Sequence, residues 1–344
     1  MNIYPHYKVA LLIIFSLFFT NLAMSTEAAR GKIVGASAHV VPSWFKDSFL
    51  DIADDVDEAA ESGRHVLLFF QLNGCPYCDR MLVESFEAEP LTSFIQQHFD
   101  TIAINVRGDR EIAFNENLVV TEKQLSSTLN VRATPAIVIL DENNKQVVRV
   151  NGYRAPERFK HILEYVQSKS YKKIKLAEYI QAHVSKDIYK IKSNALFANI
   201  TDLSIVKGPL MVIFEDSSCY DCQEFYGGLL ANALVQKEMA AYTIVQIDAS
   251  SNQALTDIDG EQTTADKLVD KYQMIYRPGV LVFNEGKLLR RHDSLTFPHH
   301  FKESLRYVAG EFYKTQTYSD YSQKRTEELL SQGINIDLSQ AKIK

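Results

Sequence analysis

The four cysteines of this sequence form two pairs with the same spacing, Cys75-Pro76-Tyr77-Cys78 and Cys219-Tyr220-Asp221-Cys222. Two cysteines separated by two residues can help to bind zinc, close a small structural disulfide or exchange disulfides with another molecule. A zinc site needs four converging ligands, usually from pairs with a short gap, whereas a long stretch of chain separates Cys78 from Cys219. The sequence therefore predicts no metal ligands, and it predicts no cofactor.

The first pair lies where thiol chemistry is favoured. An apolar run at residues 66–70 predicts a buried strand, and Cys75 follows it at the junction with a helix. Unpaired N–H groups and the helix dipole stabilise a thiolate at such a position. Cys78 lies three positions later on the same helix face, where it can attack a mixed disulfide formed by Cys75. A purely structural disulfide is the weaker interpretation, because closing so small a loop contributes only about 2 kcal/mol.

The elements around the second pair repeat those around the first in the same order. Apolar runs at residues 66–70 and 210–214 precede the pairs, and predicted strands at residues 101–106 and 242–247 follow them. Each half continues with a helix start marked by threonine, a strand that a proline opens, a hairpin and an amphipathic helix. This order predicts an α/β fold, a tandem duplication of two domains that each have a mixed central sheet flanked by helices.

Pro135 and Pro278 open matching strands at nearly the same distance after the two cysteine pairs. A proline at a strand start beside the reactive sulfur is where we expect a cis peptide bond. Because proline has no N–H, it cannot pair within a central ladder, and the backbone of the preceding residue stays available to a substrate. The expected substrate-docking residues are Pro76, Tyr77, Thr134 and Pro135 in the first half, with Arg277 and Pro278 as equivalents in the second.

The repeat divides the chain into five predicted segments. They are a signal peptide (residues 1–25), a first domain (26–167), a linker helix (168–192), a second domain (193–315) and a C-terminal extension (316–344). Phe45, Phe49 and Ile52 share one helical face ahead of the first strand, which predicts an opening helix. The linker is rich in lysine, and we interpret it as solvated. The extension is polar and predicts only a short helix around residues 327–330.

The first 25 residues have the pattern of a secretory signal. Lys8 precedes an apolar run at residues 9–19, and small residues end that run before Ser25. The run is shorter than the ~20 residues that span a bilayer, so we expect cleavage, with an uncleaved membrane anchor as the alternative. The predicted location is the periplasm, where disulfides can form. A net charge of −6 argues against a nucleic-acid partner bound by a basic surface.

Four short motifs of the first half, at residues 74–78, 105–109, 131–135 and 151–153, keep a characteristic order and spacing. On these motifs the first half resembles the thioredoxin superfamily and, within it, the exported SoxW-type thioredoxin-related proteins. The resemblance implies a thioredoxin fold and a reductant that receives electrons from a membrane electron-donor protein.

The second half resembles the thioredoxin fold alone. It has Asp221 inside the cysteine pair, an arginine before its proline, and Leu295 where the first half has Gly152. Cytosolic thioredoxins carry a buried acid six positions before the first cysteine, and here Phe69 and Ile213 occupy those positions. We therefore expect proton transfer to and from Cys78 to use water or another group.

These observations predict a periplasmic thiol–disulfide oxidoreductase. It would reduce disulfides of proteins or small thiol compounds at Cys75 and Cys78, with Cys219 and Cys222 as a second candidate redox pair that relays electrons. A disulfide isomerase or oxidase is the alternative among enzymes. A binding or scaffold protein whose second repeat is redox-inactive is the alternative outside them.

We predict that the second cysteine pair is the more reducing one. Glu215, Asp216, Asp221 and Glu224 surround it, and that stretch contains no lysine or arginine. Negative charge disfavours a thiolate, and a pair whose reduced form is less stabilised has the lower reduction potential.

Redox titration in glutathione buffers measures the two potentials separately. The Cys75→Ser/Cys78→Ser variant reports the second pair, and the Cys219→Ser/Cys222→Ser variant reports the first. A second pair that is more oxidising than the first by about 30 mV, which corresponds to ~1.4 kcal/mol, would contradict the prediction.

Overall fold

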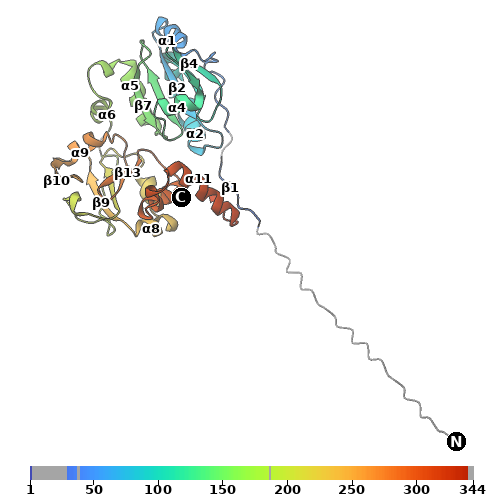
Figure 1. Cartoon of the computed structure of the whole chain (residues 1–344). Helices are drawn as coiled ribbons and strands as arrows, with labels where there is room; N and C mark the ends of the chain where they lie inside the picture. The colour runs from blue at the N-terminus through green and yellow to red at the C-terminus, as the bar shows by residue number, and fades with distance from the viewer. Residues whose placement is uncertain (2–28, 37–38, 186, 340–344) are drawn as a thin grey trace.

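A computed structural model of the chain describes Met1 and residues 29–36, 39–185 and 187–339. The predicted signal peptide, apart from Met1, lies outside the described residues. Figure 1 shows two lobes, which correspond to the two predicted halves. Each lobe is built around a four-stranded sheet.

The first sheet has the strand order β3-β2-β6-β7. Its strands are β2 (His65–Gln71), β3 (Phe99–Asn105), β6 (Ala136–Leu140) and β7 (Gln146–Asn151). Strand β2 runs parallel to β3 and antiparallel to β6, and β6 forms a hairpin with β7. The helices and the small hairpin of this repeat are α1 (Ile52–Glu61), α2 (Pro76–Met81), the π-helical turn η1 (Leu82–Phe86), α3 (Leu91–His98), β4 (Glu111–Asn115), β5 (Leu118–Thr121), α4 (Glu122–Thr128) and α5 (Pro156–Gln167).

The second sheet has the equivalent strand order β9-β8-β12-β13 and the same directions. Its strands are β8 (Leu210–Glu215), β9 (Thr243–Asp248), β12 (Gly279–Asn284) and β13 (Lys287–His292). The other elements are α7 (Cys222–Glu224), the π-helical turn η4 (Phe225–Leu229), α8 (Ala233–Met239), β10 (Ala254–Thr256), β11 (Gln262–Thr264), α9 (Ala265–Tyr272) and α10 (Pro298–Ala309). The predicted tandem duplication of an α/β domain with a mixed sheet is confirmed.

Each sheet is covered on both faces. In β2, Leu67 and Phe69 pack into one hydrophobic core, while Leu68 and Phe70 pack into another on the opposite face. Strand β8 alternates in the same way. Because both faces are buried, the central strands are continuously apolar, and this property made them visible in the sequence.

The opening helix is shorter than predicted. Helix α1 begins at Ile52, where the Asp51 side chain accepts a backbone N–H of the first turn. Leu50 has a φ of 66°, a left-handed conformation that interrupts a right-handed helix. Phe45 is buried in the core outside the helix, and Phe49 is fully exposed. The shared spacing of these side chains was therefore a wrong indication of a helical face.

In the described residues between α5 and β8, the chain forms two 3₁₀ turns and one short α-helix. The linker region contains the 3₁₀ turn η2 (Ser170–Lys172) and helix α6 (Leu176–His183), and the 3₁₀ turn η3 (Leu203–Ile205) precedes β8. Helix α6 packs against the first repeat through the buried side chains of Tyr179 and Ile180.

The C-terminal segment forms a longer helix than predicted. After the 3₁₀ turn η5 (Phe312–Lys314), helix α11 runs over Tyr318–Ser331, and Thr317 caps it by accepting the Asp320 N–H at 3.2 Å. Tyr321 is buried and donates a hydrogen bond to Glu303 of α10 at 2.8 Å. Part of the predicted polar extension therefore belongs to the core of the second repeat.

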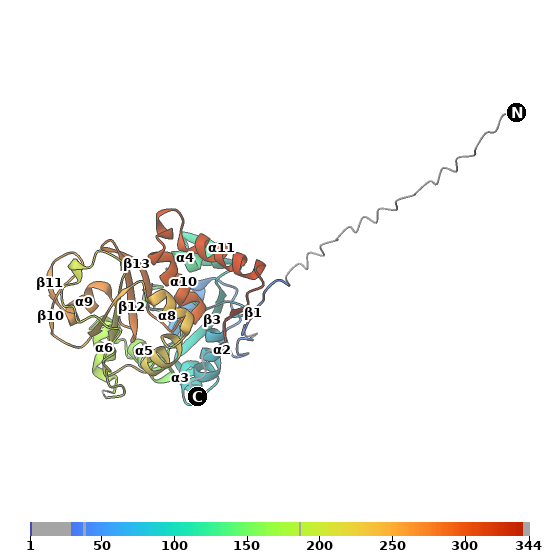
Figure 2. The same cartoon turned by 90° about the horizontal axis from the view of Figure 1, so that it is seen from below.

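The N-terminal segment pairs with the end of the chain. Strand β1 (Ile33–Val34) runs parallel to β14 (Ile336–Asp337), beside α11 (Figures 1 and 2). Arg30 supports this contact through an ion pair with Glu327 of α11 at 2.6 Å. Within the described ranges, no helix has the length and apolar character needed to cross a bilayer.

Candidate active site

Cys75 is the residue on which helix α2 starts. Strand β2 ends at Gln71, and after a short turn Cys75 becomes the N-cap of α2, with Pro76 in the first turn. Proline suits this position because its fixed φ is helical and a missing N–H costs nothing there. The Cys78 N–H donates to Cys75 Sγ at 3.1 Å, and the two cysteines form a disulfide. The structure therefore places Cys75 where a thiolate receives a backbone N–H and the helix dipole.

Pro135 lies at the end of the sheet from which the Cys75 turn leaves. Phe70 of β2 is paired with Ala136 of β6, so the residue before Ala136 is level with the end of β2. The Thr134–Pro135 peptide bond is cis, as predicted. The Gly152 N–H donates to the Pro135 carbonyl at 2.7 Å, which joins the turn before α5 to the same end of the sheet.

The helix of the second cysteine pair starts later than its counterpart. Helix α7 begins at Cys222 and has Asp221 as N-cap, so Cys219 lies outside the helix. Cys219 and Cys222 form the second disulfide, and the Arg277–Pro278 bond is cis. The two repeats therefore have the same order of elements but differ in where the helix begins relative to the cysteine pair. Cys219 consequently lacks the helix-cap position that Cys75 has.

The acidic residues around the second pair are partly neutralised by distant arginines, contrary to the charge count made from the sequence. Arg277 Nε donates to Asp216 at 2.6 Å, and Arg80 of the first repeat pairs with Glu224 at 3.0 Å. Burial opposes ionisation of Asp216, yet Arg277 and Ser218 hold the pKa of its carboxyl below the usual value.

Asp221 is a buried acid inside the second pair. Burial raises the pKa of Asp221 to about 6, although the Tyr276 hydroxyl donates to its carboxylate at 2.6 Å. Tyr276 lies two residues before Pro278, so this hydrogen bond ties the cysteine turn to the proline turn within the second repeat.

Glu215, which the sequence indicated only as one of several nearby negative charges, contacts the second cysteine pair directly. Its side chain is fully buried at the end of β8, and its Oε2 atom lies 3.6 Å from Cys222 Sγ. Burial raises the pKa of the Glu215 carboxyl to about 7, although the Tyr226 hydroxyl and the Gln246 amide contact it. A carboxyl in this position can exchange a proton with the Cys222 thiol, so in the second repeat Glu215 is a group that can replace the acid missing at Ile213.

A signal for Glu215 was present in the strand pattern. Side chains alternate along a strand, so Glu215 shares a face with Ile213, the position at which an acid was sought. Phe70 is paired with Ala136 in the first repeat, and Phe214 is paired with Gly279 in the second. The residues that follow them, Gln71 and Glu215, are therefore equivalent. The Gln71 amide oxygen lies 3.2 Å from His39 Nε2. At this position the first cysteine pair therefore has the amide of Gln71, and the second has the carboxyl of Glu215.

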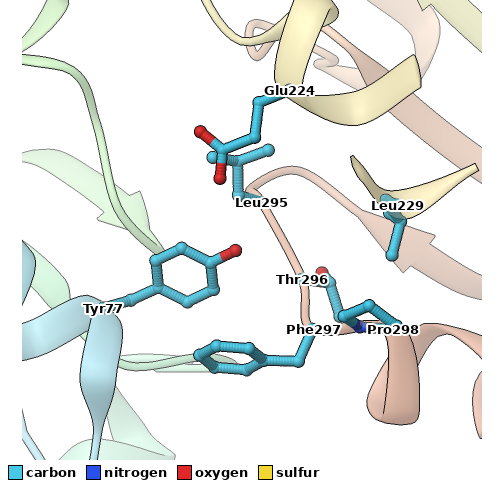
Figure 3. Close-up of a pocket in the computed structure, with 7 residues that line it drawn as sticks. All are labelled: Tyr77, Glu224, Leu229, Leu295, Thr296, Phe297 and Pro298. Carbon is cyan, nitrogen blue, oxygen red and sulfur yellow. The ribbon is translucent and has the colours of Figure 1, made fainter. Parts of the chain in front are cut away.

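The two cysteine helices face each other across the contact between the repeats. The Tyr77 ring lies 4.4 Å from the Phe297 ring, between that ring and Glu224 of α7 (Figure 3). Arg80 reaches across to Glu224 and also pairs with Glu84 of its own helix segment at 3.0 Å. The predicted docking residues Pro76 and Tyr77 are consequently buried, while Thr134 is half-buried.

Ser294, and not Leu295 as expected from the sequence, is the equivalent of Gly152. Gly152 lies four residues before the proline that starts α5, and Ser294 lies four residues before the proline that starts α10. These two residues touch, since a Cβ atom on Gly152 would lie 2.0 Å from the Ser294 Cβ. Gly152 also has a φ of 82°, which favours glycine.

Among the residues that the structure describes, no group of three or more His, Cys, Asp or Glu side chains is arranged to hold a metal ion.

Two mixed sheets, each with a cysteine pair and a cis proline at one end, define a tandem protein of thioredoxin-like domains. A family model described as thioredoxin-like domain matches residues 52–167 and 199–309. The chain belongs to this family. No curated protein matches the chain.

Several solved structures are similar to part of the chain. A thioredoxin-fold protein from Helicobacter pylori has 25% identity over 35% of this chain and 84% of its own, with a TM-score of 0.32. A thioredoxin from Thermus thermophilus has 21% identity over 35% of this chain and 85% of its own, with a TM-score of 0.28. The periplasmic thioredoxin SoxS from Paracoccus pantotrophus has 21% identity over 31% of this chain and 99% of its own, with a TM-score of 0.23.

Glu215→Gln is expected to stabilise the oxidised protein at alkaline pH. The folded pKa of about 7 lies above the usual value of 4.5, so the folded state binds the carboxyl proton more tightly. This contribution is complete below the usual pKa and is lost as the pH rises to the folded pKa. Between about pH 5 and pH 8, the wild-type protein should lose on the order of 2–3 kcal/mol of stability relative to the variant.

Chemical denaturation of both proteins at the two pH values measures this difference. Glu261→Gln removes an exposed carboxyl of the same repeat and should leave the wild-type pH profile unchanged. Identical pH profiles for the wild-type protein and Glu215→Gln would show that the Glu215 carboxyl is ionised throughout this range.

Proposed function

We propose that the protein is a thiol–disulfide oxidoreductase whose reacting pair is Cys75 and Cys78. The observation that carries the proposal is the position of Cys75, which caps helix α2 with its sulfur 3.1 Å from the Cys78 N–H. A backbone N–H at a helix start lowers the pKa of a thiol, and the thiolate is the form that attacks disulfides. The second pair lacks this helix-cap geometry, so the first pair is the better nucleophile of the two.

The reaction proceeds by two exchanges. In the reduced protein the Cys75 thiolate attacks one sulfur of a substrate disulfide, that disulfide breaks, and the other substrate sulfur leaves as a thiolate that takes a proton. Cys78 then loses its proton and attacks Cys75 Sγ, which forms the Cys75–Cys78 disulfide and releases the second substrate thiol. Two electrons pass from the protein to the substrate. A dithiol donor restores the reduced pair by the same steps in reverse.

The proposed setting is the periplasm. The apolar N-terminal run supports export, and the four cysteines in two disulfides suit an oxidising compartment. The resemblance to SoxW-type proteins supports the reductive direction and a membrane protein as the electron donor. The proposed substrates are disulfides of proteins or small thiol compounds.

A relay between the two pairs is the second candidate function. It is favoured by the contact between helices α2 and α7, which brings the two cysteine-bearing faces together through Arg80 and Glu224. In this relay electrons pass from Cys219 and Cys222 to Cys75 and Cys78. If the second pair does not react, the second repeat is a binding module.

We predict that reduction of insulin disulfides depends on the first pair. Cys75→Ser should lower the rate by a factor of at least ~10², because it removes the nucleophile. Cys78→Ser should accumulate a mixed disulfide between substrate and Cys75, because the resolving thiol is absent. Insulin turbidity and mass spectrometry measure the two effects. Wild-type turnover by Cys75→Ser would contradict the proposal.

The relay predicts a disulfide between the two repeats. In the Cys78→Ser/Cys222→Ser variant, mild oxidation should join Cys75 to Cys219 within one chain. The matched control, Cys75→Ser/Cys219→Ser, keeps two cysteines that are completely buried in their own repeats, and it should not form such a link. Peptide mapping identifies the linked pair. Separate glutathione adducts on Cys75 and Cys219, without a link, would rule out the relay and leave the binding module.

A further inference from the structure

The two repeats meet through the same face. Arg80 and Glu224, which pair across the contact, each lie five positions after the first cysteine of their repeat. Gly152 and Ser294, which touch, are also equivalent positions. Contacts between equivalent residues indicate a pseudo-twofold arrangement, in which each repeat presents the face that carries its cysteine pair.

The contact is made of specific polar interactions as well as apolar packing. Arg154, buried before helix α5, donates to the Asp293 carbonyl at 2.9 Å and lies over the Tyr276 ring at 4.4 Å. Arg158 of α5 donates to the Ile275 carbonyl at 2.8 Å. A buried guanidinium without an acceptor is costly, so the carbonyl that Ile275 offers to Arg158 stabilises the closed arrangement. Arg154 also donates to the carbonyls of its own repeat at residues 151–153, so the second repeat supplies one of its four acceptors.

In this arrangement the reacting disulfide has little exposed surface, and its neighbour Tyr77 is covered by the second repeat. Cys75 and Tyr77 are each only 7% exposed, and the Tyr77 ring packs against Phe297 of the second repeat (Figure 3).

The turn of Thr134 and Pro135 is hydrogen-bonded to Gly152, which Ser294 of the second repeat touches. A protein disulfide that docks along this turn therefore competes with the second repeat for space. A small thiol compound needs much less space to reach Cys75 than a protein does.

We infer that the second repeat is docked on the substrate face of the first, and that a protein disulfide reaches Cys75 only after the two repeats have separated. The inference rests on the proposed function, since it assumes that Cys75 reacts with an external disulfide. The contact between the two repeats is thus the surface that controls access of protein disulfides to Cys75.

The contacts that are lost on separation define the chemistry of the protein that replaces the second repeat. Arg158 then loses the Ile275 carbonyl, and Arg154 loses the Asp293 carbonyl but keeps three carbonyls of its own repeat. Arg80 keeps Glu84 but loses the carboxylate of Glu224. Tyr77 needs an apolar or aromatic neighbour. An extended protein segment with an acidic and an aromatic side chain supplies all of these groups.

The test compares two maleimides on the fully reduced, full-length protein. N-ethylmaleimide and a polyethylene-glycol maleimide carry the same reactive group but differ in size, and peptide mapping gives the rate at Cys75. The measured quantity is the ratio of the two labelling rates at Cys75, small reagent to large, divided by the same ratio for glutathione. In the wild-type protein this ratio should be at least about ten. Glu224→Arg places like charges opposite Arg80 and should reduce this ratio about threefold to tenfold.

Ser294→Tyr tests the same contact without a change of charge, because it inserts a ring where Gly152 lies against Ser294. It should also reduce the ratio. Glu285→Arg changes the same charge outside the contact, where Glu285 pairs with Lys314, and it should keep the wild-type ratio. Circular dichroism shows whether each variant is folded. If one of the two contact variants, Glu224→Arg or Ser294→Tyr, is misfolded, the other one carries the test.

Two results would overturn the inference. One is a wild-type ratio equal to that of glutathione, which would show that the face is open. The other is a ratio that stays at the wild-type value in both folded contact variants. Labelling requires no turnover, so loss of insulin reduction with the expected labelling pattern would refute the proposed function and leave the closed arrangement intact.

Discussion

Antiparallel pairing between the central strand and the strand after the cis proline determines the geometry of both cysteine pairs. Phe70 opposite Ala136, and Phe214 opposite Gly279, bring the cysteine turn and the proline turn to one end of each sheet. In the first repeat a hydrogen bond from the Gly152 N–H to Pro135 adds the turn before α5 to that end. Each repeat therefore has a single face that carries its cysteine pair and its cis proline, and that face forms the contact between the repeats.

A few substitutions on this common framework separate the two cysteine pairs chemically. Pro76 lets a helix start directly after Cys75, whereas the second helix starts only at Cys222. Gln71 is replaced by Glu215, whose carboxyl lies beside Cys222 with a pKa of about 7. The loss of the helix cap and the added carboxyl both disfavour a thiolate in the second repeat, so they act in the direction of the predicted order of potentials.

Local pattern was enough to predict the duplication, the strands and the two cis prolines, because these depend on runs of residues that are close in sequence. It failed where the structure depends on distant partners. The pairing of Asp216 with Arg277 and of Glu224 with Arg80 leaves no trace in the residues around each acid. The helix expected from Phe49 failed for a local reason, since the backbone at Leu50 is left-handed.

The ion pair between Arg80 and Glu224 also constrains how the two copies diverge after duplication. Arg80 and Glu224 occupy equivalent positions of the two copies, so the ion pair exists only because the copies differ at this position. The effect of a substitution at one of the two positions therefore depends on the residue at the other. On this face the two halves are energetically coupled, so the sequence of one half sets which residues the other half tolerates.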